Sequence, residues 1–401
     1  MRTDLDVTSQ PLVLPFTGTR IISFAQLAQG PASVQLLADL GADVIKIERP
    51  GTGSLERTYR LRNGESLLFH MLHRNQKSVT LNLKAPEGIE IVRQLIGSAD
   101  VVAENFRPGV MDRLGLGYAE LSKLNPRLVY LSASGFGPTG PYVSRPGQDL
   151  ILQGLTGLAA ATGKADDLPT PAGSSVIDLH SAALNAFGIA AALLHREKTG
   201  KGQLITASLL DAAVHLQTEN VFDTANGIKK QRSASGLASP GASAPYGVYQ
   251  TKTDFITLSD VSLKALAEAI DEPALLDFTE AEALTRRDEV RVLVARRMLD
   301  RTAEEWLEHL LAAGIWCGPV KDYEALLSDP QFIHAKLLFE TQHPRLGTLR
   351  NIRSPITLSE APAERQPRQV APELGQHTSE ILAGLGLTAE DVARLKAAGT
   401  I

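Results

Sequence analysis

The residue best suited to chemistry in this sequence is Asp178, which stands where a loop of small residues meets a long apolar stretch. Nearly every position from Leu179 to Leu194 is apolar or small, a pattern typical of a buried helix. Asp178 would then lie at a helix N-terminus, where free N–H groups and the dipole favour an anion. A carboxylate held there, out of bulk water, can act as a nucleophile. The alternative is that Asp178 is simply the N-cap, a common position for aspartate.

Positive charges recur where strands are expected to end or helices to begin. They are Arg49, Lys84, Arg107 and Arg113. Ligands of open α/β sheets bind outside the carboxyl ends of the strands, and several cations at that edge would suit a ligand with more than one phosphate. Taken singly, each of these side chains is explained as well by a solvated surface charge.

Other kinds of site are disfavoured. The turn after the first expected strand reads AQLAQGPAS, and it lacks the G-x-G-x-x-G fingerprint of dinucleotide-binding folds. His70 and His73 are three residues apart, but no carboxylate or cysteine joins them at ligand spacing, so no metal site is expected. The chain has no G-x-S-x-G nucleophile motif. Cys317 follows a tryptophan in an apolar context and is expected to be buried and inert.

The elements that must position these residues alternate in type through the N-terminal half. Strands are expected at 20–25, 42–51, 78–83, 100–106 and 127–137, and helices at 29–41, 86–99 and 109–125, the last with a break near Gly115. This alternation predicts an α/β fold with a doubly wound, Rossmann-like parallel sheet. The chain is expected to begin with an irregular arm over residues 1–18. After residue 148 the large domain is expected to continue with a helix at 149–160, the Asp178 helix, a strand at 204–209 and a helix at 210–226.

The C-terminal half is expected to be organised differently. Residues 227–245 are rich in Gly, Ser, Ala and Pro, a composition that predicts a linker or a mobile loop. A smaller α+β domain is expected over 246–329, beginning with the strands GVYQT and FITLSD. The rest of the chain, 330–401, is expected to hold loops and short elements, with helices near 379–385 and 389–397.

Composition excludes several classes of partner. The 401 residues are 43% hydrophobic and 21% charged, which is a globular composition. The net charge is −5 with no basic block, so neither nucleic acid nor an anionic membrane is an expected partner. A single cysteine excludes an intrachain disulfide. The first residues lack the pattern of a signal peptide, and the expectation is a soluble, cytoplasmic protein.

Several longer motifs, in order along the chain, resemble the class III CoA-transferase family. They are GPASVQLLADLGADVIKIERPGTGS, NQKSVTLNLKAPEG, ENFRPGVMDRLGLG, TGKGQ, GIWCGPVKDYEALLSDPQ and LGQHTSEIL. The resemblance covers about residues 18–390. It implies a nucleophilic aspartate after a G-x-x-x-x-D segment, here Gly173 to Asp178. It also implies transfer of CoA from an acyl-CoA donor to a small carboxylic acid through an aspartyl-CoA thioester.

The resemblance carries further residues to the site. Gln29 is expected to support an oxyanion, and Gly236 and Gly241 to mark a loop over the substrate. Contacts to CoA are implied for Ala28, Arg49, Leu81, Asn82, Leu83, Lys84, Asn105, Phe106, Arg107 and Arg113. No permanently bound cofactor is implied, because coenzyme A enters as part of the substrate. The family further implies an interlocked, ring-like homodimer, with residues 330–401 returning to the large domain.

Two departures from the family bear on the choice of reaction. The chain reads Ala28-Gln29 where formyl-CoA transferase has a Gln-Ala pair, and it lacks that enzyme's long glycine run. Both argue against exchange between formyl-CoA and oxalate. The racemase branch has a His-Asp pair where this chain reads Gln148-Asp149, so one proton-transfer base is missing. An acyl-CoA racemase or isomerase remains the alternative within the fold, and a nicotinamide dehydrogenase or a non-catalytic acyl-CoA binder the alternative outside this chemistry.

Overall fold

The computed structural model of the protein describes residues 13–362, 364 and 366–401, and the chain divides into two compact units. Most of the irregular arm expected at 1–18 lies outside the described residues. Unit 1 holds residues up to Asp149 together with Val176–Ala213 and Leu337–Ile401. Unit 2 holds Leu150–Ser175 and Val214–Lys336.

Unit 1 is built on a parallel sheet of six strands, in the order β5-β2-β1-β6-β7-β8. The strands are β1 (Arg20–Ser23), β2 (Asp43–Glu48), β5 (Gln76–Thr80), β6 (Val101–Glu104), β7 (Val129–Ser134) and β8 (Leu204–Ser208). Each pairing along the sheet is parallel. The predicted α/β class with a parallel central sheet is confirmed. Each strand ends earlier than its sequence pattern indicated, and β5 begins two residues earlier than expected, at Gln76.

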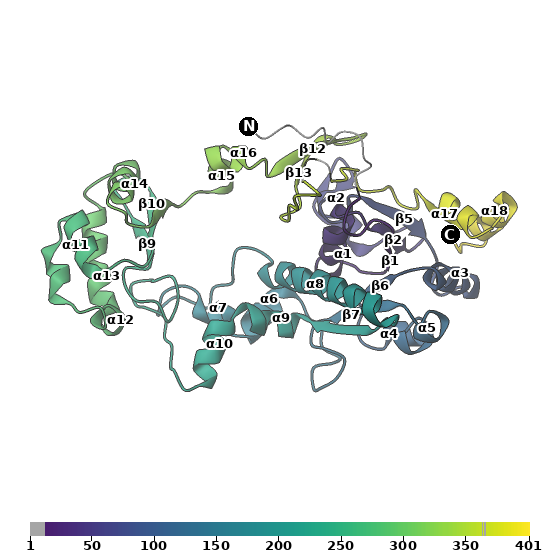
Figure 1. Cartoon of the computed structure of the whole chain (residues 1–401), viewed down its shortest axis with the longest axis horizontal. Helices are drawn as coiled ribbons and strands as arrows, with labels where there is room; N and C mark the ends of the chain where they lie inside the picture. The colour runs from purple at the N-terminus through teal and green to yellow at the C-terminus, as the bar shows by residue number, and fades with distance from the viewer. Residues whose placement is uncertain (1–12, 363, 365) are drawn as a thin grey trace. The chain divides into compact units, whose positions relative to one another are not determined.

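Alternate residues along each strand enter different cores, which explains why the strands are apolar throughout. Ile21 and Val44 face α1 (Gln29–Asp39) and α8 (Val176–Thr199), which pack together on one face of the sheet (Figure 1). Ile22 and Ile45 face the other side. That side is covered by α3 (Pro86–Gly97), α5 (Tyr118–Leu124), α17 (Thr378–Gly384) and α18 (Ala389–Ala397). A sheet buried on both faces leaves its edges and strand ends for function.

The remaining elements of unit 1 are short, and some depart from expectation. The break expected near Gly115 in the helical segment 109–125 is present, and Gly115 adopts a φ of +70° between α4 (Val110–Arg113) and α5. The strands β12 and β13 form an antiparallel hairpin where only loops and short elements were expected. These further elements are η1 (Leu55–Thr58), β3 (Leu61–Arg62), β4 (Glu65–Ser66), α2 (Leu67–His73), α4 (Val110–Arg113), β12 (Leu338–His343) and β13 (Gly347–Ile352). The helix α6 (Asp149–Leu155) begins at the last residue of this segment of unit 1 and continues into unit 2.

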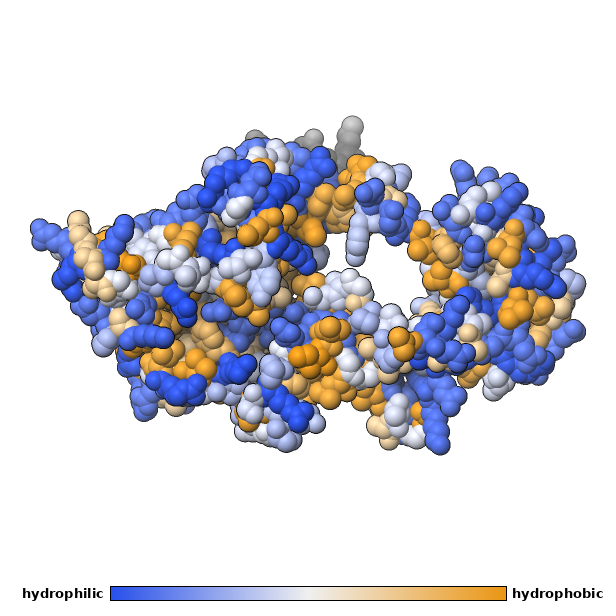
Figure 2. Space-filling model, turned by 180° about the vertical axis from the view of Figure 1, so that it is seen from behind, coloured by the Kyte–Doolittle hydropathy of each residue, from blue (hydrophilic) through white to orange (hydrophobic). Residues whose placement is uncertain are grey.

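Unit 2 has a core of its own. An antiparallel sheet in the order β11-β10-β9 packs against helices around Trp306 and Tyr249, which are almost fully buried. Apolar groups also reach the surface in separate patches among hydrophilic ones (Figure 2). Its elements are α7 (Leu158–Ala161), α10 (Thr218–Ala225), β9 (Gly247–Gln250), β10 (Phe255–Leu258), α11 (Leu263–Ile270), η2 (Pro273–Asp277), α12 (Glu282–Thr285), α13 (Arg287–Met298), α14 (Ala303–Ala312), β11 (Cys317–Pro319), α15 (Tyr323–Leu327) and α16 (Pro330–His334); α9 (Leu209–Leu216) crosses between the units.

The division between the units differs from the boundaries expected from sequence. Residues 150–175 and 214–226 were expected in the large domain and lie in unit 2. The reason is a set of hydrogen bonds from Arg232, whose guanidinium donates to the carbonyls of Thr162, Ala165 and Asp167. Ser233 is also buried and accepts two backbone N–H groups. Part of the segment 227–245, expected to be a linker or mobile loop, is therefore packed into the unit.

The helix α8 is more exposed to solvent than its apolar sequence predicts. Within the described residues it is the one helix long and apolar enough to cross a membrane by length and composition. It packs on α1, β7 and β8 instead, and its buried side includes Ser181 and Asn185. The expectation of burial on all sides is wrong for the single chain, because Leu179, Phe187 and Leu194 are 49%, 73% and 60% exposed.

Candidate active site

Asp178 lies in the first turn of α8 and is not its N-cap. Its carboxylate has no hydrogen bond or ion pair with any residue that the structure describes. Burial, and after it the nearby charge of Asp149, raises the pKa of Asp178 to about 6. At neutral pH the carboxylate is therefore mostly ionised, unshared and poorly hydrated, which is the state of a competent nucleophile.

Asp149 takes the capping role that the sequence had offered to Asp178. Its Oδ2 accepts the backbone N–H groups of Ile177, at 2.7 Å, and of Asp178, at 3.0 Å. Asp149 itself begins α6, and its carboxylate bonds to the start of α8. Because Asp149 already accepts these N–H groups, the side chain of Asp178 is not needed to cap the helix and can contact a substrate.

The N-terminus of α1 adjoins that of α8. Gln29 Nε2 donates to Ser181 Oγ at 2.7 Å, and Ser181 is one turn after Asp178. The side-chain amide of Gln29 is thus committed to Ser181, and the support of an oxyanion expected at Gln29 is left to backbone N–H groups. No side chain caps α1, and the backbone N–H groups of Ala28, Gln29 and Gly30 have no partner within the described chain. These N–H groups are the available oxyanion donors at this place.

Close packing explains the glycine at the start of α1. A Cβ on Gly30 would lie 2.6 Å from the Cβ of Ala25 and 3.2 Å from Cγ of Asn105. The side chain of Asn105 in turn binds the backbone of Gln26 twice, accepting its N–H and donating to its carbonyl, both at 2.8 Å. These residues follow β1 and β6, which is the point where the strand order reverses, and ligands of open α/β sheets bind at such a point.

The four predicted cations lie at this carboxyl edge of the sheet. Arg49 directly follows β2, Lys84 follows β5, and Arg107 and Arg113 follow β6. All four are exposed, and their side chains have no hydrogen bond or ion pair within residues 13–362, 364 and 366–401. Most other arginines of unit 1 are paired, so unpaired cations gathered at one edge indicate a polyanionic ligand.

The other residues predicted to contact CoA differ in how they are used. Leu81 is buried, and Leu83 and Phe106 pack at the margin of the same core, so their side chains serve packing. Asn82 Oδ1 accepts the N–H of Lys84, and its own N–H donates to the carbonyl of Thr400. Of the segment 81–84, only Lys84 presents an unpaired charged side chain.

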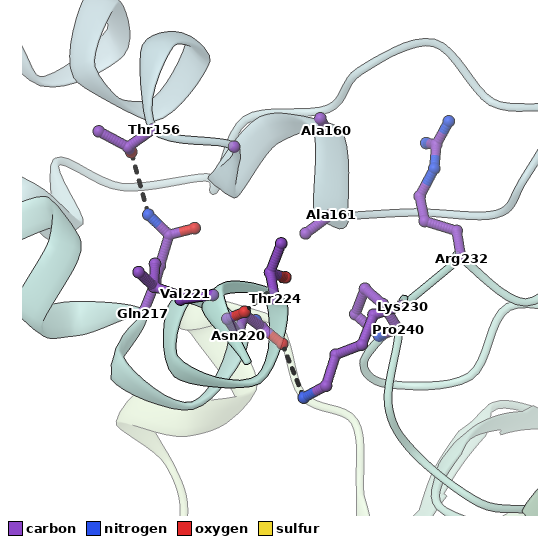
Figure 3. Close-up of a pocket in the computed structure, with 12 residues that line it drawn as sticks. Thr156, Ala160, Ala161, Gln217, Asn220, Val221, Thr224, Lys230, Arg232 and Pro240 are labelled. Atoms are coloured by element: carbon purple, nitrogen blue, oxygen red, sulfur yellow. Dashed lines mark hydrogen bonds between the residues drawn. The ribbon is translucent and has the colours of Figure 1, made fainter. Parts of the chain in front are cut away.

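The two glycines expected to mark a substrate loop, Gly236 and Gly241, lie in unit 2. Gly236 has a φ of +83°, and a Cβ on Gly241 would meet the side chain of Lys230. Nearby, residues between Thr156 and Pro240 line a cavity of about 520 Å³ (Figure 3). Lys230 at its wall already pairs with Asp223 and Glu219, so the cavity presents no unpaired lysine.

The structure brings together one set of potential metal ligands that the sequence spacing did not indicate. Glu65, His70 and His343 place their ligand atoms within 4.8 Å of one another. His343 Nδ1 accepts the N–H groups of Arg345 and Leu346, which puts the proton of a neutral ring on Nε2. Arg345 also pairs with Glu65. The lone pair of His343 Nδ1 is therefore already used, and we assign the set to holding the hairpin against α2.

Cys317 is half-buried in β11. Burial raises the pKa of its thiol, which keeps it protonated and unreactive at neutral pH. The sequence predicted a fully buried Cys317, whereas the side chain is half-buried. An unreactive thiol is expected in either case.

Comparison with known proteins shows the family to which the chain belongs. The model of CoA-transferase family III matches residues 16–378. The chain belongs to CoA-transferase family III. It is 33% identical to a succinate–glutarate CoA-transferase of Agrobacterium fabrum, over 92% of this chain and 96% of the relative. It is also 33% identical to a formyl-CoA:oxalate CoA-transferase of Bradyrhizobium diazoefficiens, over 96% and 97%.

Solved structures agree with this family III assignment. A CaiB/BaiF family protein from Brucella suis superposes with a TM-score of 0.80 at 30% identity, covering 93% of this chain and 99% of the other. A hypothetical protein from Mycobacterium tuberculosis superposes with a TM-score of 0.80 at 28% identity, over 92% and 99%. The predicted family and the prediction of a CoA-transferase enzyme are confirmed.

The structure also reveals residues of this family III protein that sequence reasoning missed. The bond from Gln29 to Ser181 and the cap from Asp149 join segments far apart in the chain, and no local pattern indicates them. A signal did exist for the buried pair of Lys46 and Glu56. Lys46 interrupts the apolar strand DVIKIE, and a lysine inside a buried strand requires a carboxylate partner.

Proposed function

We propose that this enzyme moves CoA from an acyl-CoA donor to a small carboxylic acid, with Asp178 as the covalent intermediary. The observation that carries the proposal is the unshared carboxylate of Asp178, ionised at neutral pH one helical turn before Ser181, which binds Gln29 at the uncapped start of α1. A carboxylate with no structural partner and a raised pKa is rarely idle in a protein.

Each step is an acyl substitution that conserves electrons. An oxygen of Asp178 attacks the thioester carbonyl, and the C–S bond breaks, which leaves an acyl-aspartyl anhydride and CoA thiolate. The thiolate attacks the aspartyl carbonyl and releases the donor acid as its carboxylate. The acceptor carboxylate then attacks the carbonyl of the resulting aspartyl-CoA thioester, and the C–S bond breaks, which leaves an acceptor-aspartyl anhydride and CoA thiolate. The thiolate returns to the acceptor's carbonyl, and Asp178 leaves as a carboxylate. No oxidant, reductant or permanently bound cofactor enters the sequence.

Charge develops on a carbonyl oxygen in every step. The free N–H groups of Ala28, Gln29 and Gly30 are fixed donors close to Asp178, through the contact of Gln29 with Ser181. Donors that need no reorganisation are the largest single contribution in many acyl transfers. The backbone of this segment, and not the side chain of Gln29, is therefore assigned the oxyanion role.

The unpaired cations at the carboxyl edge of the sheet are assigned to the phosphates of CoA. We expect Arg49→Ala to raise the KM for acyl-CoA by about 10- to 100-fold, the equivalent of about 1.5–3 kcal/mol for one charge-assisted contact. The kcat is expected to change little, because the phosphates are remote from the reacting carbonyl.

A matched control for Arg49 is Lys198→Ala. Lys198 is also exposed but lies at the far end of α8 from Asp178. Steady-state kinetics with one acyl-CoA at saturating acceptor measures both variants. An unchanged KM for Arg49→Ala, or an equal rise for Lys198→Ala, contradicts the assignment.

We assign a homodimer, interlocked as in the family, from the exposed apolar stripe of α8. Leu179, Phe187 and Leu194, with alanines between them, would leave a large apolar surface in water if the chain were monomeric. Phe187→Glu is expected to convert the dimer into monomers at micromolar concentration, because burying a carboxylate at an apolar contact is strongly unfavourable.

The control for this substitution is Phe187→Leu, which keeps an apolar side chain and is expected to remain dimeric. Sedimentation velocity or light scattering gives the mass of each variant. A monomeric wild-type protein with full activity, or a dimeric Phe187→Glu variant, would show that the stripe has another role.

A second candidate is racemisation of an acyl-CoA, because a carboxylate with a pKa of about 6 also suits a proton base. The two functions differ in one measurement. A mass-spectrometric screen of acyl-CoA donors against small mono- and dicarboxylic acids in heavy water reports both reactions together. We expect a new acyl-CoA formed from the acceptor, with no deuterium at the α-carbon of a 2-methylacyl-CoA. Deuterium uptake without CoA transfer to any acid would establish racemisation.

A further inference from the structure

The loop Gln26–Gln29, which leads from β1 into α1, has an unusual backbone conformation. Leu27 has a φ of +65°, in the left-handed region that a bulky residue rarely adopts. The next residue, Ala28, is also outside the helical and extended regions, with φ −120° and ψ −59°. Such a conformation persists only where the surrounding structure enforces it, and it is most often found at functional sites.

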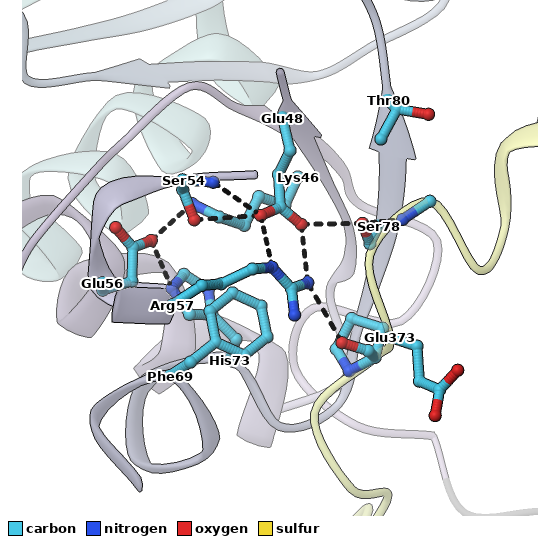
Figure 4. Close-up of polar contacts among 12 residues, drawn as sticks. Lys46, Glu48, Ser54, Glu56, Arg57, Phe69, His73, Ser78, Thr80 and Glu373 are labelled. Atoms are coloured by element: carbon cyan, nitrogen blue, oxygen red, sulfur yellow. Dashed lines mark hydrogen bonds and ion pairs between the residues drawn. The ribbon is translucent and has the colours of Figure 1, made fainter. Parts of the chain in front are cut away.

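Two buried charged side chains enforce this conformation. Glu56 Oε2 accepts the N–H of Leu27 at 3.1 Å. Lys46 Nζ donates to the carbonyl of Ala25 at 2.7 Å and pairs with Glu56 Oε1 at 2.8 Å. Figure 4 shows this pair together with His73, which contacts the same oxygen of Glu56 at 2.9 Å. The side chains of Lys46 and Glu56 are 1% and 0% exposed.

A buried ion pair is not explained by stability alone. Removing two charges from water is costly, and well-packed apolar residues in their place often give equal or greater stability. The carboxylate of Glu56 nevertheless stays ionised. Burial would raise its pKa, but Lys46, followed by His73, outweighs that effect and holds the pKa below its ordinary value. What the pair does that apolar residues cannot do is bond to the backbone on both sides of Gln26.

We propose that Lys46 and Glu56 are positioning residues, which hold the left-handed turn at Leu27 so that the free N–H groups beginning α1 face the carbonyl attacked by Asp178. The inference rests on the proposed function, since it assigns those N–H groups to the oxyanion. Asn105 completes the support by binding both polar groups of the Gln26 backbone. Lys46, Glu56 and Asn105, from three separate segments, therefore bond to the backbone of three consecutive residues, Ala25, Gln26 and Leu27.

The test replaces the pair by apolar residues of similar size, Lys46→Met with Glu56→Leu. This avoids leaving one charge buried and unpaired, and so favours folding. The expected result is a kcat lower by about 10- to 100-fold, with the KM for acyl-CoA within about threefold. That loss approaches what deletion of one oxyanion donor causes, about 10²–10³-fold.

The matched control lies at the other end of the same helix. Asp39, at the end of α1, forms a second buried pair with Arg74. Asp39→Leu with Arg74→Met is expected to alter stability but to keep the kcat per folded protein within about threefold of the wild type. Equal losses of kcat in the two double variants would show that Lys46 and Glu56 act only through stability, and would overturn the proposal.

A third substitution separates positioning from general damage. Glycine adopts a positive φ without strain, so Leu27→Gly should let the turn persist with less support. In the Lys46→Met, Glu56→Leu background we expect it to recover part of the lost kcat. No recovery there, or an equal recovery in the Asp39→Leu, Arg74→Met background, would contradict the inference.

Hydrogen exchange makes the test independent of the proposed function. If the wild-type protein transfers CoA to no acid, that function has failed, and the amide of Leu27 is then the readout. The inference expects this amide to be protected in the wild type and to exchange faster in the Lys46→Met, Glu56→Leu variant. Equal exchange in both proteins would overturn it whatever the reaction.

Discussion

Asp178→Asn is expected to lower CoA transfer by more than about 10³-fold while the protein remains folded, because the nucleophile of a covalent mechanism has no substitute. Asparagine has nearly the same shape but cannot form an anhydride. Asp178→Ala should show the same loss and guards against slow deamidation of the asparagine. Transfer assays at saturating acyl-CoA and acceptor measure both variants. A residual rate within tenfold of the wild type would remove Asp178 from the mechanism.

The same substitution should stabilise the protein at alkaline pH. The folded-state pKa of Asp178 is about 6, above its ordinary value of 3.8. Its contribution to stability is therefore present in full below pH 3.8 and is lost as the pH rises through about 6. At pH 8, Asp178→Asn should raise the free energy of unfolding by an amount on the order of 1–3 kcal/mol, and near pH 3.5 the difference should vanish.

Denaturant unfolding at pH 8 and pH 3.5 checks this sign. The exposed Asp166 provides the control, since Asp166→Asn should leave stability unchanged at both values. If Asp178→Asn proves less stable than the wild type at pH 8, the carboxylate has a structural partner, and its assignment as an unshared nucleophile is contradicted.

Asp149→Asn is the second substitution with a large expected effect. Asparagine keeps an oxygen that can accept the N–H groups of Ile177 and Asp178, but it removes the charge that helps to raise the pKa of Asp178. The acid limb of kcat/KM, which follows ionisation of Asp178, should therefore move to lower pH. Activity at pH 5.5, relative to the plateau, should rise.

Asp149→Ala separates the charge from the cap. The alanine variant lacks both the negative charge and the oxygen that accepts the N–H groups of α8. Removing an N-cap acceptor costs about 0.5–2 kcal/mol of stability. The shift of the acid limb should be shared by both variants, while only the alanine variant loses the cap acceptor. An acid limb that does not move in Asp149→Asn would show that Asp178 does not set the pH dependence.

The parallel sheet and the edge at which the four cations lie could be predicted from the sequence because both depend on local patterns. Continuous apolar strands separated by helices indicate a doubly wound sheet. Arg49, Lys84, Arg107 and Arg113 follow strands of that sheet, so their common edge follows from the topology alone. The resemblance to the family then indicated which ligand carries the matching phosphates.

Contacts between distant segments could not be predicted in the same way. The cap of α8 comes from Asp149, which is 28 positions earlier in the chain than Ile177. By propensity alone, either Asp149 or Asp178 could have capped this helix. The hairpin β12–β13 does alternate, with Phe339, Thr341 and His343 buried. It was missed because two of those three inward residues are polar, so the period of two carries no hydrophobic signal.

The most direct test of the account is to trap the covalent intermediate on Asp178. The enzyme is incubated with an acyl-CoA and hydroxylamine, which converts an aspartyl anhydride or thioester into a hydroxamate, and its peptides are analysed by mass spectrometry. The account predicts inactivation that requires both reagents, a single modified peptide with the hydroxamate at Asp178, and no labelling of Asp178→Ala. Full CoA transfer with no modification of Asp178, or labelling that persists in Asp178→Ala, would contradict it.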